Sequence, residues 1–315
     1  MPVNTKEIGF EESIEYDLLQ NGYQKGDSEE FNKDWGLDTD TLFEFIEATQ
    51  SDKLDDLKNK HGSNYKTKFL NRLARVINKR GLIDVLRTGV KSRGVNIDLV
   101  YFAPSSSLNP ELEEKYQENI LKVTRQFHYS KQKQRSLDMV LSVNGFPVVT
   151  IELKNPMTGQ TVEDAKQQYK RDRNPKELIF QYNKRSLVHF AVDPDEVYMT
   201  TELRSKDTTF LPFNKGYEGG AGNPPNPDGY KTEYLWQEVL TRDSLLDILG
   251  RFMYIKEETE IKDNQEITEE IMIFPRYHQL DAVRKITNDV LENGVGKNYL
   301  IQHSTGSGKS ITLSW

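Results

Sequence analysis

The sequence predicts an α/β protein, and three patterns in its 315 residues carry this prediction. Apolar residues recur at helical spacing in the first third, most clearly over 69–77. Two β-prone runs, 137–143 and 147–153, are joined through an Asn-Gly pair, which is a strong hairpin signal. Near the end, the short β-prone run 299–301 leads into a glycine-rich loop. Both helices and strands are therefore expected.

The remaining elements are placed by periodicity and by turn residues. Helices are expected at 42–46, 69–77, 115–123 and 277–290, with a further helix that begins at Thr161. Further strands are expected at 95–101, 187–192 and 196–201. Segment 214–229 is expected to be a long loop because it is rich in glycine and proline, and loops of this length are often functional.

Composition excludes several classes of protein. The chain contains no cysteine, which excludes a disulfide framework, a thiolate metal site and a cysteine nucleophile. Its apolar runs are far shorter than the ~18 residues that cross a bilayer, and residues 1–7 lack the apolar stretch of a signal peptide. With 14 Phe, 15 Tyr and 3 Trp the chain can still fill a core. We expect a cytoplasmic protein with no membrane partner and, at ~150 residues each, about two domains.

Formal charge is unevenly distributed along the chain. The whole carries −7, but residues 122–185 contain 13 Lys and Arg against 6 Asp and Glu, which gives +7 for this block and −14 for the remainder. Such asymmetry is expected when one face of an acidic protein meets a polyanion. A merely solvated surface explains the block equally well at this point.

Asp138, Glu152 and Lys154 are the sharpest candidates for a catalytic site. Side chains alternate along a strand, so Glu152 and Lys154 share one face. Asp138 lies near the start of the first strand of the hairpin, 14 residues before Glu152. At this separation the two acids share a face only if an odd number of residues is looped out. We therefore expect a three-residue loop at 143–145, or a bulge with the same effect.

Two carboxylates on one face form an oxygen-ligand site for Mg²⁺, with the carbonyl of Leu153 as a third protein ligand. The ion would acidify a bound water and neutralise charge on a scissile phosphate, while Lys154 would orient that water or stabilise the transition state. The Glu-x-Lys pattern alone is weak evidence, because it recurs at 113–115 and 260–262. The copy at 152–154 differs because it ends an apolar strand that has an aspartate on its partner.

The helix that begins at Thr161 supports a role in binding a polyanion. Asp164 occupies the position of a capping-box acid. Basic side chains on or just beyond this helix suit contacts to nucleic-acid phosphates. They are Lys166, Lys170, Arg171 and Arg173. Ordinary packing of an amphipathic helix through Ala165 and Tyr169 is the alternative, and both can hold because different faces are involved.

Residues 303–310, HSTGSGKS, match a phosphate-binding loop after the run 299–301, with His303 in place of the usual first glycine. Backbone N–H groups of such a loop surround the phosphates, Lys309 reaches the β- and γ-phosphates, and the Ser310 hydroxyl binds Mg²⁺. The predicted nucleotide-binding residues are Thr305, Gly306, Ser307, Gly308, Lys309 and Ser310. Because no acidic strand or arginine finger follows before Trp315, we expect a fragment that binds ATP without hydrolysing it.

The combination resembles the R subunits of type I restriction enzymes over nearly the whole chain. The resemblance is carried by Asp138, by 152–154 and by 144–149, and it continues in three further segments. These segments are 164–173, 199–201 and 210–216. The resemblance implies a PD-(D/E)xK nuclease domain with a mixed central sheet flanked by helices, followed by the first elements of a RecA-like P-loop domain. The implied boundaries are 1–255 for the nuclease domain and 271–315 for the start of the helicase-like translocase. Between them, the run of charged residues at 256–270 indicates a charged linker.

This resemblance also implies an activity, cofactors and partners. Such subunits cleave double-stranded DNA after ATP-driven translocation, with Mg²⁺ and ATP as cofactors. They work with modification (methyltransferase) and specificity subunits. Asp138 and Glu152 would bind the metal, and Lys154 would assist catalysis. Arg276 and Gln279 are similar to the helicase motif that recognises adenine, and a glutamine offers both the donor and the acceptor that the adenine edge needs.

Two positions of the family pattern are less clear in this sequence. Many relatives have a Gln-x-x-x-Tyr motif after the hairpin, whereas Gln168 and Tyr169 are adjacent here, so that Gln167 or Gln168 would serve. An N-terminal helical glutamate often joins the site. The candidates for this position are Glu11, Glu12 and Glu15, and Glu12 is the residue that we assign to the site.

Two other functions stay open on the sequence. In the first, the chain belongs to a helicase or remodelling ATPase whose N-terminal domain only binds DNA, and the hairpin acids are structural. In the second, it is a docking scaffold for partner subunits centred on the loop 214–229.

Overall fold

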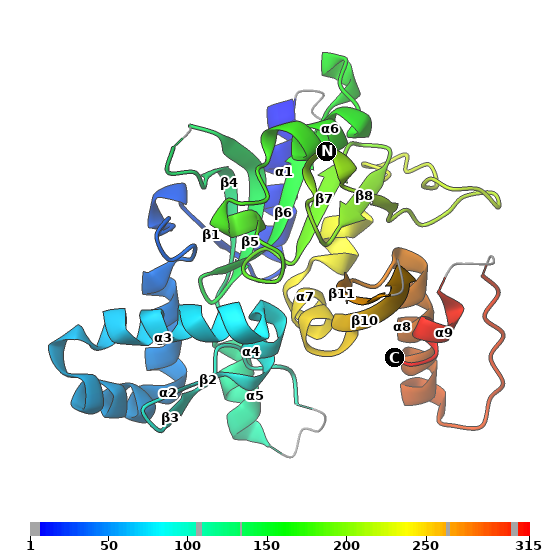
Figure 1. Cartoon of the computed structure of the whole chain (residues 1–315). Helices are drawn as coiled ribbons and strands as arrows, with labels where there is room; N and C mark the ends of the chain where they lie inside the picture. The colour runs from blue at the N-terminus through cyan, green and yellow to red at the C-terminus, as the bar shows by residue number, and fades with distance from the viewer. Residues whose placement is uncertain (1–6, 105–108, 133, 263–264, 304–307) are drawn as a thin grey trace.

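The computed structural model describes residues 7–104, 109–132, 134–262, 265–303 and 308–315. At its centre lies a seven-stranded mixed sheet with the order β1-β4-β5-β6-β7-β8-β9 (Figure 1). The pairs β1–β4 and β6–β7 are parallel and the other neighbours are antiparallel. The strands are β1 (Gln24–Lys25), β4 (Leu121–His128), β5 (Ser136–Val143), β6 (Phe146–Leu153), β7 (Val188–Val192), β8 (Val197–Thr200) and β9 (Leu211–Pro212). The predicted strands at 137–143, 147–153, 187–192 and 196–201 are thus confirmed.

Helices cover both faces of this sheet. Helix α1 (Glu7–Gln20) packs its apolar side, including Phe10 and Ile14, into the main core with Met139 and Ile151. Helix α6 (Val162–Asp172) packs against β6 and β7 and places Tyr169 in a second apolar cluster. Because strand side chains alternate between faces, these two helices bury opposite faces of the hairpin β5–β6.

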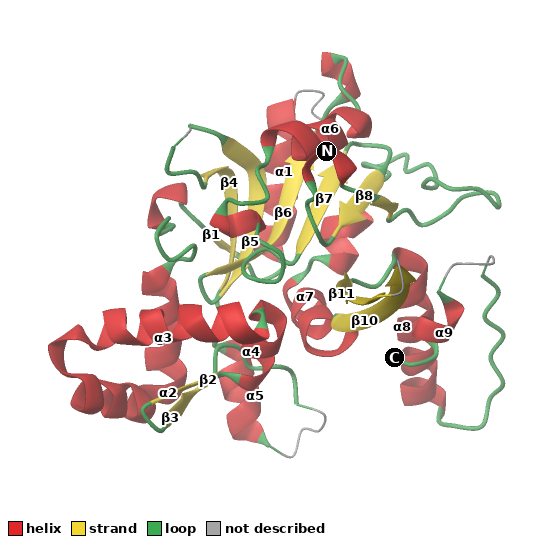
Figure 2. Ribbon diagram, viewed as in Figure 1, coloured by secondary structure: helices red, strands yellow, loops and turns green. Residues whose placement is uncertain are grey.

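Figure 2 shows a mainly helical part below the sheet, as the periodicity of the first third predicts. Its elements are α2 (Thr39–His61), α3 (Tyr65–Arg80), α4 (Leu82–Thr88), α5 (Pro110–Gln117) and the small hairpin of β2 (Val90–Ser92) and β3 (Val95–Ile97). Helix α2 is capped by Asp38, whose carboxylate accepts hydrogen bonds from the backbone N–H groups of Asp40 and Thr41. Asp38 is therefore the N-cap residue, and Thr39 is the first residue of the helix.

The predicted bounds of one helix and one strand in this region are wrong. The expected helix at 115–123 ends at Gln117, and β4 begins at Leu121. Between them, the buried side chain of Asn119 bonds to the backbone of Tyr101, and Leu121 pairs with Val143 of β5. Tertiary pairing therefore overrides the helical pattern here. The strand expected at 95–101 is shorter, since β3 ends at Ile97.

The charged segment 256–270 forms strands rather than an irregular linker. Strands β10 (Tyr254–Lys262) and β11 (Gln265–Ile273) make an antiparallel hairpin with nine residue pairs. The Ile and Thr residues interspersed among the charges of this segment favour strands, so the expected linker is wrong. The domain boundaries on either side stay a prediction.

The C-terminal segment contains α7 (Arg242–Asp247), the predicted α8 (Tyr277–Asn293) and α9 (Lys309–Thr312). The strand expected at 299–301 is absent from the described structure. Leu300 is 90% exposed, and no described strand lies beside it to accept its hydrogen bonds. An isolated strand is not stable without such a partner.

Short turns and one long loop complete the described chain. Single 3-10 turns lie at Ser28–Glu30, Gly62–Asn64, Pro156–Thr158, Leu178–Phe180 and Ser205–Asp207, and π turns at Leu235–Val239 and Ile248–Phe252. The loop predicted at 214–229 has no regular element apart from an isolated bridge between Tyr217 and Gly220. Within the described residues, no helix combines the length and the apolar character needed to cross a bilayer.

Candidate active site on the hairpin

A bulge sets the register of the β5–β6 hairpin. The turn contains only Asn144 and Gly145, because Val143 pairs with Phe146. Ser142 pairs with Pro147 and Leu141 with Val149, which leaves Val148 as the extra residue. The expected three-residue loop is therefore wrong, and the alternative bulge with the same effect is confirmed.

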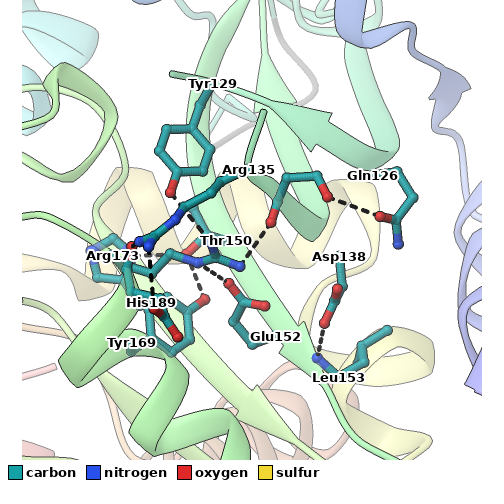
Figure 3. A network of polar contacts seen from close by, with 12 residues as sticks. Gln126, Tyr129, Arg135, Asp138, Thr150, Glu152, Leu153, Tyr169, Arg173 and His189 are labelled. Carbon is teal, nitrogen blue, oxygen red and sulfur yellow. Dashed lines mark hydrogen bonds and ion pairs between the residues drawn. The ribbon is translucent and has the colours of Figure 1, made fainter. Parts of the chain in front are cut away.

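This register places Asp138 and Glu152 opposite each other. Met139 pairs with Ile151, so the preceding residue of β5 faces the following residue of β6, and both acids point away from the face that α1 covers. Figure 3 shows the two acids on neighbouring strands, Asp138 near the start of β5 and Glu152 near the end of β6, in the middle of the sheet order. The backbone N–H of Leu153 donates to Asp138 Oδ2 at 2.7 Å, and Lys154 Nζ lies 3.9 Å from the same oxygen.

The carboxylate of Glu152 is fully buried. The Nε–H of Arg173 donates to its Oε1 at 2.5 Å, while Oε2 has no hydrogen-bond partner among the described residues. Burial, and then the charge of Asp138, raise the pKa of Glu152 to about 8. A buried carboxylate oxygen without a partner is costly, which is the condition expected of a group that receives a ligand.

The residues around this oxygen fit a hard divalent cation. Two carboxylates and a nearby backbone carbonyl offer oxygen ligands, and Mg²⁺ completes its shell with water when a protein supplies few ligands. No cluster of three or more His, Asp or Glu side chains suited to a metal occurs in the described part of the chain. The candidate is therefore the acid pair, with the Leu153 carbonyl as a further ligand.

The N-terminal helix brings Glu11, rather than Glu12, toward the acid pair. Glu11 is buried, accepts hydrogen bonds from Arg125 and Gln126, and has a pKa raised by burial and by the charge of Asp138. Glu12 is 56% exposed, and its described contact is an ion pair of 3.9 Å with Arg125. Glu15 is buried against Arg125 and Lys25. Glu12 is thus the least suited of the three candidates.

Helix α6 contributes a buried polar network behind Glu152. The hydroxyl of Tyr169 bonds to Thr150 Oγ1 at 2.8 Å, which in turn bonds to His189 Nδ1 at 2.7 Å (Figure 3). The residue four before Tyr169 is Ala165. Gln168 is half-buried, and its side chain makes no hydrogen bond within the described structure. Asp164 accepts from the backbone of Thr161, which confirms the capping-box acid. Tyr169 thus lies at the site, whereas Gln168 has no described role there.

Several basic side chains of the block 122–185 are engaged by partners within the protein. Arg173 is buried on Glu152, which makes its predicted contact with DNA phosphate wrong. Lys166 pairs with Glu163 and lies 3.8 Å from the ring centre of Tyr198. Internal partners also engage other members of the block, namely Lys122, Arg125, Lys184 and Arg185. Part of the excess of positive charge is therefore structural, while Lys170 and Arg171 on α6 remain accessible.

Sequence patterns alone missed Arg173, Thr150, His189 and Gln126 as members of this environment. Glu152 and Arg173 are 21 residues apart and on different elements, so no local pattern connects them. Thr150 precedes Glu152 by two residues, and strand alternation could have placed both on one face.

The phosphate-loop candidates are described in part. Thr305, Gly306 and Ser307 lie outside the described residues. Gly308 has a φ of +83°, and α9 begins at the next residue, with Lys309 Nζ donating to the His303 carbonyl at 3.0 Å. Ser310 follows in the first turn of that helix.

Gln279 reaches the same loop, and Arg276 lines the cavity beside it. Gln279 accepts from the backbone N–H of Arg276 at 2.9 Å and donates to the Gly308 carbonyl at 3.1 Å. A cavity of about 600 Å³ opens here, and its lining includes Arg276, Gln279 and Gly308 together with Arg204 and Lys256. This cavity is separate from the acid pair, so the described structure contains two distinct candidate sites.

Comparison with known proteins decides the family. Residues 12–208 match the family model described as the N terminus of the type I restriction enzyme R protein. The chain belongs to this family. It is 26% identical over 196 residues to type I restriction enzyme endonuclease subunits from Staphylococcus aureus strains COL, MSSA476 and MRSA252. The match covers 62% of this chain and 18% of the length of each relative. All the hairpin residues described above fall inside the matched segment.

Proposed function

We propose that this chain is the DNA-cleaving part of a type I restriction enzyme, and that it hydrolyses phosphodiester bonds of double-stranded DNA with Mg²⁺. The observation that carries the proposal is the pairing of Asp138 with Glu152, beside Lys154. Membership of the R protein family supports it independently. Its cytoplasmic location, and assembly with modification and specificity subunits, are part of the same proposal.

The roles of the two acids follow from which of their carboxylate oxygens already accept hydrogen bonds. Asp138 Oδ2 accepts a hydrogen bond from the Leu153 N–H, and Glu152 Oε1 accepts one from Arg173. Asp138 Oδ1 and Glu152 Oε2 would hold the metal, with the Leu153 carbonyl beside them. A bound Mg²⁺ supplies Lewis acidity and a more acidic water. Lys154 is 7% exposed, and its ammonium group is placed to stabilise negative charge on the scissile phosphate.

We further propose that residues 303–310 bind ATP and belong to a helicase-like translocase. Gln279 supports this role because its buried side chain bonds to Gly308 within the loop. Arg276, which precedes it by three residues, lines the same cavity. Lys309 would contact the β- and γ-phosphates, and the cavity beside these residues offers the space for a nucleotide.

The nuclease proposal is tested with plasmid DNA, Mg²⁺ and the chain, alone and together with ATP and the modification and specificity subunits. Asp138→Asn and Glu152→Gln are expected to abolish cutting while DNA binding persists. Glu111→Gln serves as the control, because this acid forms an exposed ion pair with Lys115 in α5. Cutting by Asp138→Asn at the wild-type rate would overturn the proposal and favour a domain that only binds DNA.

A further inference from the structure

The side chain of Arg173 makes three contacts beside the acid pair, and one of them is to Glu152. Its side chain is 3% exposed, and its Nε–H donates to Glu152 Oε1. One terminal nitrogen, Nη2, donates to the Ser136 carbonyl at 2.7 Å, and the other lies 3.4 Å from the Tyr129 hydroxyl. Figure 3 shows the guanidinium between these groups. A planar group with donors in a fixed fork therefore joins two strands of the sheet.

These contacts bear on the positions of both acids. Ser136 lies two residues before Asp138 on β5, and Glu152 lies at the end of β6. Arg173 follows the last residue of α6, so that one side chain connects the helix to both strands. Because the guanidinium holds Oε1, the oxygen of Glu152 that has no partner among the described residues is Oε2.

We propose that Arg173 is a positioning residue for the metal site, which orients Glu152 so that Oε2 faces the cation and keeps the start of β5 in register with the end of β6. The inference rests on the proposed nuclease function. Arg173 contacts neither DNA nor the scissile bond in this role, and acts through Glu152.

Arg185 shows what a purely structural arginine looks like in the same protein. It is equally buried, and its guanidinium donates to the backbone carbonyls of Trp35 and Gly36 rather than to an acid. Both arginines tie distant segments together, but Arg173 also holds an oxygen of a proposed metal ligand. Arg185 therefore provides a matched control for loss of a buried arginine.

The sign of the change in metal affinity distinguishes positioning from simple charge neutralisation. If Arg173 only neutralised the acids, its removal would make the site more negative and would strengthen cation binding. If Arg173 positions Glu152, its removal leaves a buried carboxylate without its partner and free to turn, and binding weakens. Loss of a group that orients a metal ligand typically costs about 10- to 100-fold in affinity.

Binding of Mn²⁺ to the whole chain, measured by titration calorimetry without DNA, tests the inference. Arg173→Gln is expected to weaken binding by about 10-fold or more. Arg173→Lys, which keeps the charge without the fork, is expected to fall between this variant and wild type. Arg185→Lys is expected to lower the unfolding temperature and to leave the Mn²⁺ affinity of the folded protein unchanged.

Each variant decides the question separately. Unchanged or tighter Mn²⁺ binding by folded Arg173→Gln overturns the inference. If that variant does not fold, wild-type affinity in Arg173→Lys overturns it. Failure of the nuclease proposal looks different, because the wild-type chain would then bind no Mn²⁺ or would bind it equally well after Asp138→Asn.

Discussion

Asp138 and Glu152 face each other across β5 and β6 because Val148 is looped out of the ladder between them and the turn. Without this extra residue, the two carboxylates would point to opposite faces of the sheet. The turn itself is buried, with Asn144 fully inaccessible, and it is held by the helical part of the protein. The register that forms the site therefore depends on contacts at the far end of the hairpin.

Gly145→Ala is expected to destabilise the protein strongly. Gly145 has a φ of +85°, and a Cβ there would lie 2.1 Å from the Asp38 carbonyl oxygen, which is backbone. Gly159→Ala is the control, since Gly159 has a φ of +77° with open space around it, and should cost about 1–2 kcal/mol from its left-handed backbone alone. Urea unfolding should show a clearly larger loss for Gly145→Ala, and equal losses would contradict the proposed clash.

Asn144→Ala is expected to lose about 2–5 kcal/mol of unfolding free energy. The Asn144 side chain accepts a hydrogen bond from the Ile120 N–H and donates to the carbonyl of Leu99 and the side chain of Asn119. Its removal leaves several buried groups unsatisfied at about 1–3 kcal/mol each, with partial relaxation. Asn71→Ala on the exposed side of α3 is the comparison, and a similar loss at both positions would disprove the role of the buried network.

His189 is expected to make the protein acid-sensitive. Burial lowers the pKa of His189 to about 3, so the folded state keeps the ring neutral while the unfolded state takes up a proton below its ordinary pKa near 6.5. Stability should therefore be fully present above about pH 6.5 and fall as the pH is lowered toward 3. Unfolding of wild type and His189→Gln, compared at pH 7.5, 5.5 and 4.5, should show a smaller decline in the variant. Parallel curves would exclude this histidine as the cause.

Mg²⁺ and pH are expected to act on stability together through Glu152. Since burial raises the pKa of Glu152 to about 8, the folded state holds a proton that the unfolded state has lost above about pH 4.5. In a chelator, stability should decrease as the pH rises from about 4.5 to 8, and Glu152→Gln should remove this part of the slope. Mg²⁺ at pH 8 should raise the unfolding temperature of wild type but not of Glu152→Gln. Equal stabilisation of both proteins would place the metal elsewhere.

Local sequence patterns predicted the elements that carry the site. The β-prone runs around Asn144–Gly145, the capping acid Asp164 and the periodicity of α8 all appear as expected. These features depend on neighbours in the chain, on strand alternation and on capping chemistry, which a sequence displays directly. The residue types Asp, Glu and Lys at one hairpin end were therefore recognisable before any contact was known.

Tertiary structure decided which side chains meet and which elements survive. It buried Glu11 within the influence of Asp138, it buried Arg173 on Glu152, and among the described residues it gives 299–301 no strand partner. These features depend on residues that are far apart in the sequence. A buried charged side chain requires a partner of opposite charge, and a strand requires a neighbouring strand, and neither partner has to be close in the chain. By itself, the sequence determined the kind of chemistry available at the hairpin. The folded chain decided the positions and partners of these side chains, because contacts between residues far apart in the sequence form only when the helices pack on the sheet.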